Sequence, residues 1–196
     1  MAPYFETVTS FAAVETPNVP TQKFLEASDG LIKMFDLIGG AVFGFVQTDL
    51  KSNIAGVRRY FESTKETSPT LELLAESDQS SGGSKEATAC LVRLLRGLSL
   101  TYNALQQLQE DPNAELHVCF RRSYDRVLRH HHSFVIRSAV AVAIRAVPWR
   151  DDFYRRIAQG GPVEDLDAAM KKWLIGLQDV VDHMSAWLRE KSYGNV

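Results

Sequence analysis

The first candidates for chemistry in this sequence are a carboxylate and an amide that interrupt an apolar helical stripe. Read as a helix, residues 42–60 place one set of side chains on a single face at three- and four-residue steps: Val42, Val46, Asp49, Asn53, Val57 and Tyr60. Burying such polar groups without partners costs roughly 2–7 kcal/mol. Asp49 and Asn53 therefore either make structural hydrogen bonds to a neighbouring helix or meet a polar ligand.

Two further polar residues border apolar helical faces. Arg93 is in line with Gly97 and Leu100 within a long apolar pattern, and His132 is in phase with the small residues of the helix expected after it. Each has a structural explanation by itself, because arginine heads reach solvent past apolar surface and histidines on apolar faces are commonly hydrogen-bonded core residues. Their hydrogen-bonding chemistry complements that of Asp49 and Asn53, which suggests one shared polar site.

The run of histidines at 130–132 does not predict a metal site. Adjacent histidines cannot all point the same way on a helix, and neither HExxH nor a paired-carboxylate spacing accompanies them. The nucleotide-binding signatures GxGxxG and GxxxxGK are also missing from the sequence. We therefore predict no metal and no cofactor.

Length and composition indicate one globular domain. The chain has 196 residues, of which 45% are hydrophobic and 23% charged, so a sizeable core is possible and two domains are not expected. The net charge of −2 hides an arginine-rich segment at 121–156. Local basicity in a neutral protein suggests an anionic partner or membrane surface rather than nucleic acid.

The sequence predicts a cytoplasmic protein. Cys90 and Cys119 lie within apolar helical patterns and are typical of core residues in a reducing compartment. The N-terminus does not have the basic and apolar regions of a signal peptide, and no apolar stretch approaches the ~20 residues that span a bilayer.

Apolar periodicity predicts an all-α chain of about eight helices. The expected helices cover 21–38, 41–61, 70–75, 85–109, a segment begun by Asp111 and Pro112, the stretch before Pro148, 150–158, and a long last helix opened by Pro162. Residues 77–84 are expected to form a flexible loop. We divide the chain into an extended N-terminal segment, 1–20, and a single domain, 21–196.

Five segments resemble the glycolipid transfer protein family, most closely its fungal members linked to heterokaryon incompatibility. Each segment is weakly specific alone, but their order and spacing are specific, and the resemblance covers nearly the whole chain from Phe24 onward. The segments are Phe24-Leu25-Glu26-Ala27, Asp49-Leu50-Lys51-Ser52-Asn53-Ile54, Leu95-Arg96-Gly97-Leu98, His131-His132-Ser133-Phe134-Val135 and the run from Ala146 to Tyr154.

The resemblance implies a two-layer helical sandwich that binds one sphingolipid and carries it between membranes without covalent chemistry. By the family pattern, Asp49 and Asn53 would bind the headgroup sugar and the lipid amide nitrogen, and His132 the amide carbonyl. The lipid chains would enter a collapsible apolar pocket. Our candidates for its lining are Phe35, Phe43, Val46, Leu94, Phe134, Val140 and Ile144.

Two departures from the family pattern leave the headgroup open. Glycolipid-specific members stack the sugar on a tryptophan where this chain has Arg93, and they have a lysine where it has Gly56. Relatives that carry ceramide 1-phosphate use arginine at the Arg93 position, but they also have a lysine in place of Asn53 and an arginine in place of Ala89. A guanidinium suits phosphate. We predict a glycosylceramide-type ligand, with a phosphate-headed sphingolipid as the alternative.

A membrane-docking surface is predicted around Trp149. Trp149, Arg150, Tyr154 and Phe134 combine apolar rings with basic heads, as membrane–water interfaces favour. The membrane contact is expected to be peripheral and transient, and the protein a monomer, with a homodimer as the alternative.

Two other classes of function stay open at this point. An enzyme could use Asp49 and His132 as an acid–base pair, although no nucleophile motif accompanies them. A helical interaction module could keep the fold without binding lipid.

Overall fold

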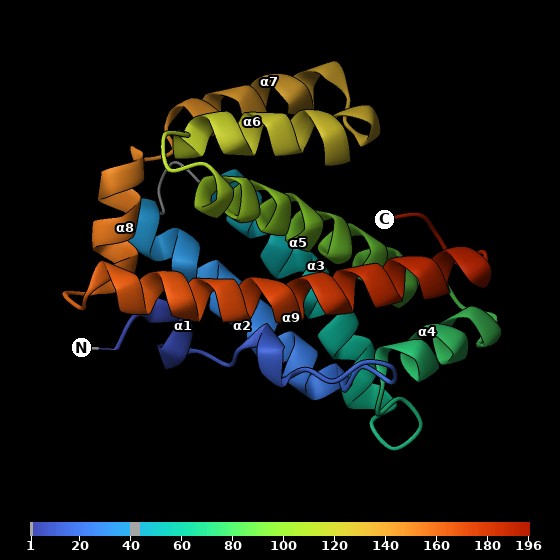
Figure 1. The fold of residues 1–196 in the computed structure, drawn as a ribbon. Coiled ribbons are helices and arrows are strands. Elements are labelled where there is room, and N and C mark those ends of the chain that lie inside the picture. The colour runs from blue at the N-terminus through green and yellow to red at the C-terminus, as the bar shows by residue number, and fades with distance from the viewer. Residues whose placement is uncertain (1, 40–43) are drawn as a thin grey trace.

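The computed structural model describes residues 2–39 and 44–196, and this part of the chain is helical (Figure 1). It holds nine α-helices and two 3-10 helices, and its only extended pairing is an isolated bridge between Pro20 and Thr70. The elements are α1 (Tyr4–Thr7), η1 (Phe11–Ala13), α2 (Thr21–Gly39), α3 (Gly44–Ser63), α4 (Leu71–Ser80), α5 (Glu86–Glu110), α6 (Leu116–Val127), η2 (Arg129–His131), α7 (Phe134–Arg145), α8 (Arg150–Ala158) and α9 (Val163–Glu190). The predicted all-α class is confirmed.

Helix α5 is the centre of the fold. It contacts α3, α4, α6 and α9, and Figure 1 shows it running between α6 and α9. Its fully buried leucines are Leu91, Leu94, Leu95, Leu98, Leu105 and Leu108. A helix that is apolar around much of its circumference has to be enclosed by other elements. Each buried leucine contributes roughly 1.5–3 kcal/mol to that packing.

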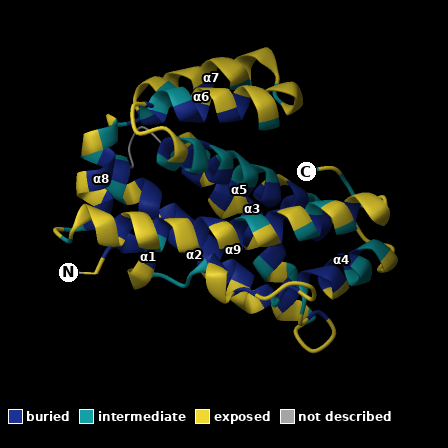
Figure 2. Ribbon diagram, in the orientation of Figure 1, coloured by how far each residue is buried: buried dark blue, intermediate teal, exposed yellow. Residues whose placement is uncertain are grey.

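The helices around α5 are amphipathic. In α9 the buried positions recur at three- and four-residue steps, as Leu166, Met170, Trp173, Leu177 and Val180 show. Figure 2 shows the result as alternating buried and exposed patches along α9 and α2. This is the pattern from which the helices were predicted.

The N-terminal segment packs against α9. The ring of Phe11 lies 5.3 Å from that of Trp173, and Phe5 lies 5.1 Å from it on centroid distances. Gly176 permits the approach, since a Cβ there would come within 2.3 Å of the Ala12 main-chain nitrogen. Residues 2–19 therefore include two helical turns and contribute to the core. The division of the chain at residue 20 stays a prediction.

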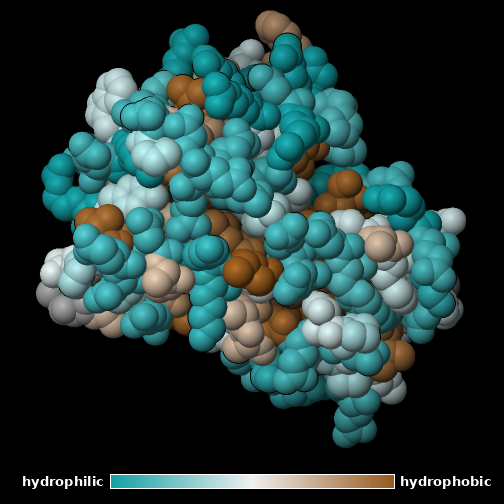
Figure 3. Space-filling model, in the orientation of Figure 1, coloured by the Kyte–Doolittle hydropathy of each residue, from teal (hydrophilic) through white to brown (hydrophobic). Residues whose placement is uncertain are grey.

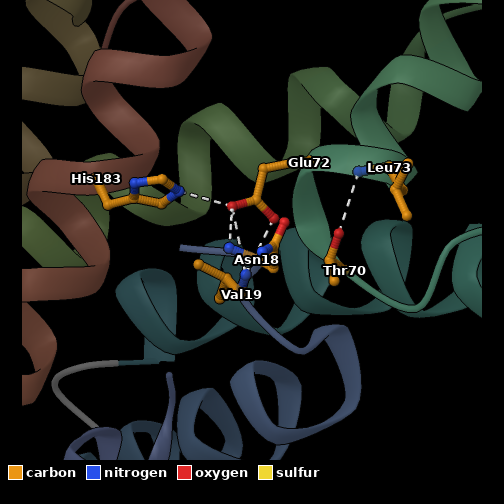
Figure 4. Close-up of polar contacts among 6 residues, drawn as sticks. All are labelled: Asn18, Val19, Thr70, Glu72, Leu73 and His183. Carbon is orange, nitrogen blue, oxygen red and sulfur yellow. Dashed lines mark hydrogen bonds and ion pairs between the residues drawn. The ribbon is translucent and has the colours of Figure 1, made fainter. Parts of the chain in front are cut away.

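A buried carboxylate ties the N-terminal segment to α4 and α9 (Figure 4). Glu72 accepts hydrogen bonds from the main-chain nitrogens of Asn18 and Val19, both at 3.0 Å, and lies 2.6 Å from Nε2 of His183. Thr70 caps the same end of α4 by accepting from the nitrogen of Leu73. With its oxygens satisfied by charge-assisted hydrogen bonds, the carboxylate can be buried.

Helix α4 is longer than predicted. It continues to Ser80 instead of ending at Ala75, so much of the loop expected at 77–84 is helical. The physical reason is Asp78, whose carboxylate accepts from the nitrogen and the hydroxyl of Thr88 at 2.8 and 2.7 Å. These bonds join the end of α4 to the start of α5.

Helix α6 begins later than predicted. Asp111 does not cap it, because its carboxylate accepts from the nitrogen of Asn113 at 2.9 Å and its carbonyl accepts from the nitrogen of Ala114. These bonds form a turn, and the helix starts at Leu116.

Exposed apolar side chains gather on and next to α7. Figure 3 shows a mostly hydrophilic face on which hydrophobic side chains form separate patches. Four of the large exposed apolar side chains belong to residues 134–149: Phe134, Val135, Val142 and Trp149. In the described part of the chain, no helix is both long and apolar enough to cross a membrane.

Candidate functional site

A cavity of about 300 Å³ lies between α3, α5, α6 and α7, with Phe35 of α2 on its wall. Most of its lining is apolar. The apolar residues are Phe35, Phe45, Val46, Leu50, Leu100, Phe120, Leu128, Ile136, Val140, Ala143, Ile144 and Val147. Such a space suits a hydrocarbon chain, because it offers many contacts and few unpaired polar atoms.

Two arginines, two histidines and one aspartate also line this cavity, and we call these five residues the polar cluster. They are Asp49 of α3, Arg93 and Arg96 of α5, His131 at the end of η2, and His132 directly after it. The charges of Arg93 and Arg96 act on each other, and those of Asp49 and Arg96 act on His132. The cavity wall therefore carries two guanidinium groups, two imidazoles and one carboxylate.

The arginines reach the cavity along one face of α5. Arg93, Gly97 and Leu100 follow at three- and four-residue steps, and Arg96 lies beside them. Gly97 lets α3 come close, since a Cβ there would lie 2.8 Å from Cδ2 of Leu50. The sequence predicted this stripe, and in the structure it forms part of the cavity wall.

The phase of His132 with the following residues suggested that it lies on α7. The structure places it outside that helix. It is an extended residue between η2 and Ser133, and the hydroxyl of Ser133 caps α7. Its Nδ1 is 3.1 Å from the hydroxyl of Tyr124 on α6. If that hydroxyl donates, the neutral ring carries its proton on Nε2, which is then a donor.

Burial is the main influence on both cluster histidines. It lowers the pKa of His132, a shift that Asp49 opposes and Arg137 and Arg96 reinforce. Burial also lowers the pKa of His131, and the positive charge of Arg96 lowers it further. Both rings are thus biased toward the neutral form at pH 7, and the fixed positive charge of the cluster is that of Arg93 and Arg96.

Neither Asp49 nor Arg93 makes an ion pair in the described part of the chain. Both side chains are exposed to the open cavity. Their charged groups are therefore available to a polar ligand.

Asn53 is brought near the site but not onto the cavity wall. Its side chain is buried, and its amide donates to the main-chain carbonyl of Asp49 at 2.9 Å. The expected pair therefore separates into a wall residue, Asp49, and a residue buried behind it.

The predicted chain-lining residues also divide. Phe35, Val46, Val140 and Ile144 line the cavity. Leu94 does not, and it is fully buried in the core. Phe134 points outward with 82% of its surface exposed. Phe43 lies outside the described residues.

The predicted docking residues differ in their exposure and in their contacts with the rest of the protein. Trp149 is exposed, but the guanidinium of Arg150 donates to the carbonyls of Leu108, Asp111 and Ala114, at 2.7 to 3.2 Å. Arg150 thus closes the C-terminal end of α5, where unpaired carbonyls need donors.

Tyr154, unlike Arg150, is buried. It is buried beneath that guanidinium, and burial is the main reason why its pKa rises to about 12. Arg150 and Tyr154 therefore make contacts that stabilise the fold, and their role in docking stays a prediction.

Comparison with known proteins identifies the family. The family model for glycolipid transfer protein matches residues 19–159. A glycolipid transfer protein of Aureobasidium melanogenum is 32% identical over 178 residues, which are 91% of this chain and 87% of the relative. The chain belongs to the glycolipid transfer protein family.

The fold agrees with that assignment. The crystal structure of HET-C2, a fungal glycolipid transfer protein, superposes with a TM-score of 0.88 at 30% identity, covering 95% of this chain and 96% of that one. This match confirms the predicted two-layer fold of the family. A mouse ceramide-1-phosphate transfer protein superposes almost as well, with a TM-score of 0.87 at 21% identity over 97% and 98% of the chains. The shared fold therefore does not distinguish the headgroup.

Two members of the polar cluster, Arg96 and His131, were not among the predicted site residues. Arg96 could have been found from its position three residues after Arg93, because that spacing keeps two side chains on one helical face. His131 had no such signal, since the turn that aims it at the cavity is not visible in the periodicity of the sequence.

Proposed function

We propose that this protein is a non-enzymatic sphingolipid transfer protein that holds one lipid in the cavity between α3, α5, α6 and α7. The supporting observation is the wall itself, an apolar lining that carries one carboxylate, two guanidinium groups and two imidazoles. An apolar chain and a polar headgroup with an amide are what such a wall can satisfy together. Membership of the glycolipid transfer protein family supports the same function.

The hydrocarbon would supply most of the affinity. Removing a methylene group from water contributes about 0.8 kcal/mol. A volume of about 300 Å³ is at the small end for a ligand site, so a two-chain lipid has to widen it. Helix α7 is the wall best able to move, because it packs mainly on α6 and keeps much of its surface exposed.

The first headgroup candidate is a glycosylceramide-type sugar. Asp49 can accept from sugar hydroxyls or from the lipid amide, and His132 can donate to the amide carbonyl. The match to fungal glycolipid transfer proteins at 32% and 30% identity supports this candidate.

A phosphate-headed sphingolipid is the second candidate. It is favoured by a specific observation, the presence of Arg93 and Arg96 on the cavity wall while Asn53 is buried behind it. Arginine forks match phosphate oxygens and form strong charge-assisted hydrogen bonds.

We also propose that α7 and Trp149 make the transient membrane contact. Val135, Val142 and Trp149 are exposed, and the exposed side chains of Arg137 and Arg145 lie on the same segment. Apolar and basic groups together favour the membrane–water interface. We expect a cytoplasmic protein, since Cys90 and Cys119 are free and buried, as in reducing compartments. We also expect a monomer, with a homodimer as the alternative.

A vesicle transfer assay tests the function. Donor vesicles would carry labelled glucosylceramide, ceramide 1-phosphate or phosphatidylcholine, and the protein would be added with unlabelled acceptor vesicles. We expect transfer of at least one sphingolipid and none of phosphatidylcholine. Mass spectrometry of the recovered lipid should find it unchanged, whereas a new product would indicate an enzyme. No transfer and no bound lipid would favour an interaction module instead.

A further inference from the structure

The guanidinium of Arg96 is held from outside the cavity by the segment that follows α9. Its Nε and Nη2 both donate to the main-chain carbonyl oxygen of Asn195, at 3.0 and 2.6 Å. Arg96 also lines the cavity as part of the polar cluster. One residue thus joins the candidate headgroup site to a segment almost a hundred positions later in the chain.

That segment is positioned by packing and not only by this contact. The nitrogen of Tyr193 donates to the carbonyl of Leu188 at 2.9 Å, and the Tyr193 ring lies 5.7 Å from that of Trp187. Gly194 has φ +149° and rests against α5, since a Cβ there would lie 2.8 Å from Cγ2 of Val92. A larger residue at 194 would push the segment away from α5, where Arg96 lies one turn after Val92.

The Arg96 nitrogens that donate to Asn195 are the same ones that would donate to a bound phosphate. Nε and Nη2 form one of the two-donor edges with which a guanidinium binds a pair of anionic oxygens. Here a single carbonyl oxygen occupies both donors. A phosphate headgroup that uses this edge has to displace the carbonyl, whereas a headgroup bound by Asp49 and His132 alone does not.

We propose that the Asn195 carbonyl is an internal competitor for Arg96 and that the segment 193–195 thereby sets the headgroup class of the site. With the contact closed, Arg96 is satisfied internally and the site favours an uncharged sugar. With the contact open, Arg96 joins Arg93, and the two guanidinium groups favour a phosphate monoester. This inference rests on the proposed function, because it takes the polar cluster as the headgroup end of the lipid site.

The test opens the contact without touching the polar cluster. Gly194→Val combines an unfavourable φ with a collision against Val92, so it should lift Asn195 off Arg96. We expect the ratio of ceramide 1-phosphate to glucosylceramide transfer to rise about tenfold, the scale of one hydrogen bond to a charged group.

Gly82→Val is the matched control. Gly82 also has a positive φ, at +68°, but a Cβ there meets no atom within 4 Å and the residue does not line the cavity. The control should keep the wild-type ratio although it also places valine at a positive φ. If the ratio for Gly194→Val stays constant or falls, the Asn195 carbonyl does not compete with the headgroup for Arg96. The proposed function still holds if both lipids are carried. If the wild type carries neither lipid, both proposals fail.

Arg96→Lys tells whether the effect runs through the guanidinium edge. Lysine keeps the charge but has no two-donor fork. In that background Gly194→Val should leave the ratio unchanged, and an equal rise would overturn the proposal. This comparison needs only variants that still bind lipid, which native mass spectrometry can establish.

Hydrogen exchange on the wild-type protein gives an independent measurement that needs no variant. Residues 193–196 should exchange faster when ceramide 1-phosphate is bound and not when glucosylceramide is bound. Inorganic phosphate forms a third arm, in which faster exchange would show that the anion alone opens the contact. Equal exchange with both lipids contradicts the proposal.

Discussion

In α3 the side-chain amide of Asn53 donates a hydrogen bond to the main-chain carbonyl of Asp49, one helical turn earlier, at 2.9 Å. Asn53 is only 3% exposed, whereas the carboxylate of Asp49 opens to the cavity. Residues that look like a pair in the sequence therefore differ in their surroundings. We therefore expect substitution of Asp49 to affect lipid transfer and substitution of Asn53 to affect stability.

Asp49→Val should abolish sphingolipid transfer with little change in melting temperature. The carboxylate makes no ion pair in the described structure, so removing it leaves no buried partner unsatisfied. The measurements are transfer between vesicles and thermal unfolding. Asn53→Ala is the comparison, and it should lower the free energy of unfolding by about 1 kcal/mol. If Asp49→Val unfolds the protein instead, Asp49 is a structural residue.

Arg93→Trp should shift the preference toward glycosylceramide. The substitution removes a guanidinium that has no ion-pair partner in the described structure and supplies an aromatic face on the cavity wall. Losing a hydrogen bond to a charged group costs about 1.5–3 kcal/mol, which is on the order of tenfold to a hundredfold in relative affinity. The quantity to compare is the ratio of glucosylceramide to ceramide 1-phosphate transfer in wild type and variant. An unchanged ratio would mean that Arg93 does not read the headgroup.

Trp149→Ala should weaken vesicle binding more than it weakens lipid affinity in detergent. The ring is 64% exposed beside the apolar outer surface of α7, so its loss removes membrane contact without emptying the core. Ile175→Ala is a suitable control, because Ile175 is similarly exposed but lies on α9. Anionic lipid should strengthen the docking of the wild type and salt should reverse that gain. Equal effects of the two substitutions would argue against docking through this surface.

Arg150→Ala should act on stability, not on docking. The guanidinium donates to three carbonyls at the end of α5 and in the turn after it, so its loss should cost about 1.5–3 kcal/mol in the free energy of unfolding. Arg155→Ala on the same helix should cost at most about 1 kcal/mol, since its partner among the described residues is the surface carboxylate of Asp152. Denaturant unfolding of the two variants gives both values. A normal stability with lost vesicle binding would return Arg150 to the docking surface.

Much of the fold was predictable from the sequence, because helices leave a periodic signal that does not depend on their neighbours. The bounds of α8, Arg150–Ala158, agree with the predicted segment, and α9 starts directly after Pro162 as expected. The start of α6 was missed because Asp111 forms a local turn with Asn113, and the end of α4 was missed because a side chain bonds to the next helix. The carboxylate of Asp78 accepts a hydrogen bond from Thr88 and extends α4. The local sequence pattern does not predict that hydrogen bond.

For the site, the sequence by itself determined which residue types were available and on which helical faces they would lie. It named Asp49, Arg93 and His132, which do line one cavity, and it indicated the family from the order of short segments. Only the tertiary structure decided which face of α5 meets the cavity, that Asn53 and Tyr154 are buried, and that Arg150 donates to carbonyls at the end of α5. It alone brought Asn195 to Arg96. Periodicity gives the direction of a side chain about its own helix axis, whereas its partners depend on how the helices pack against one another.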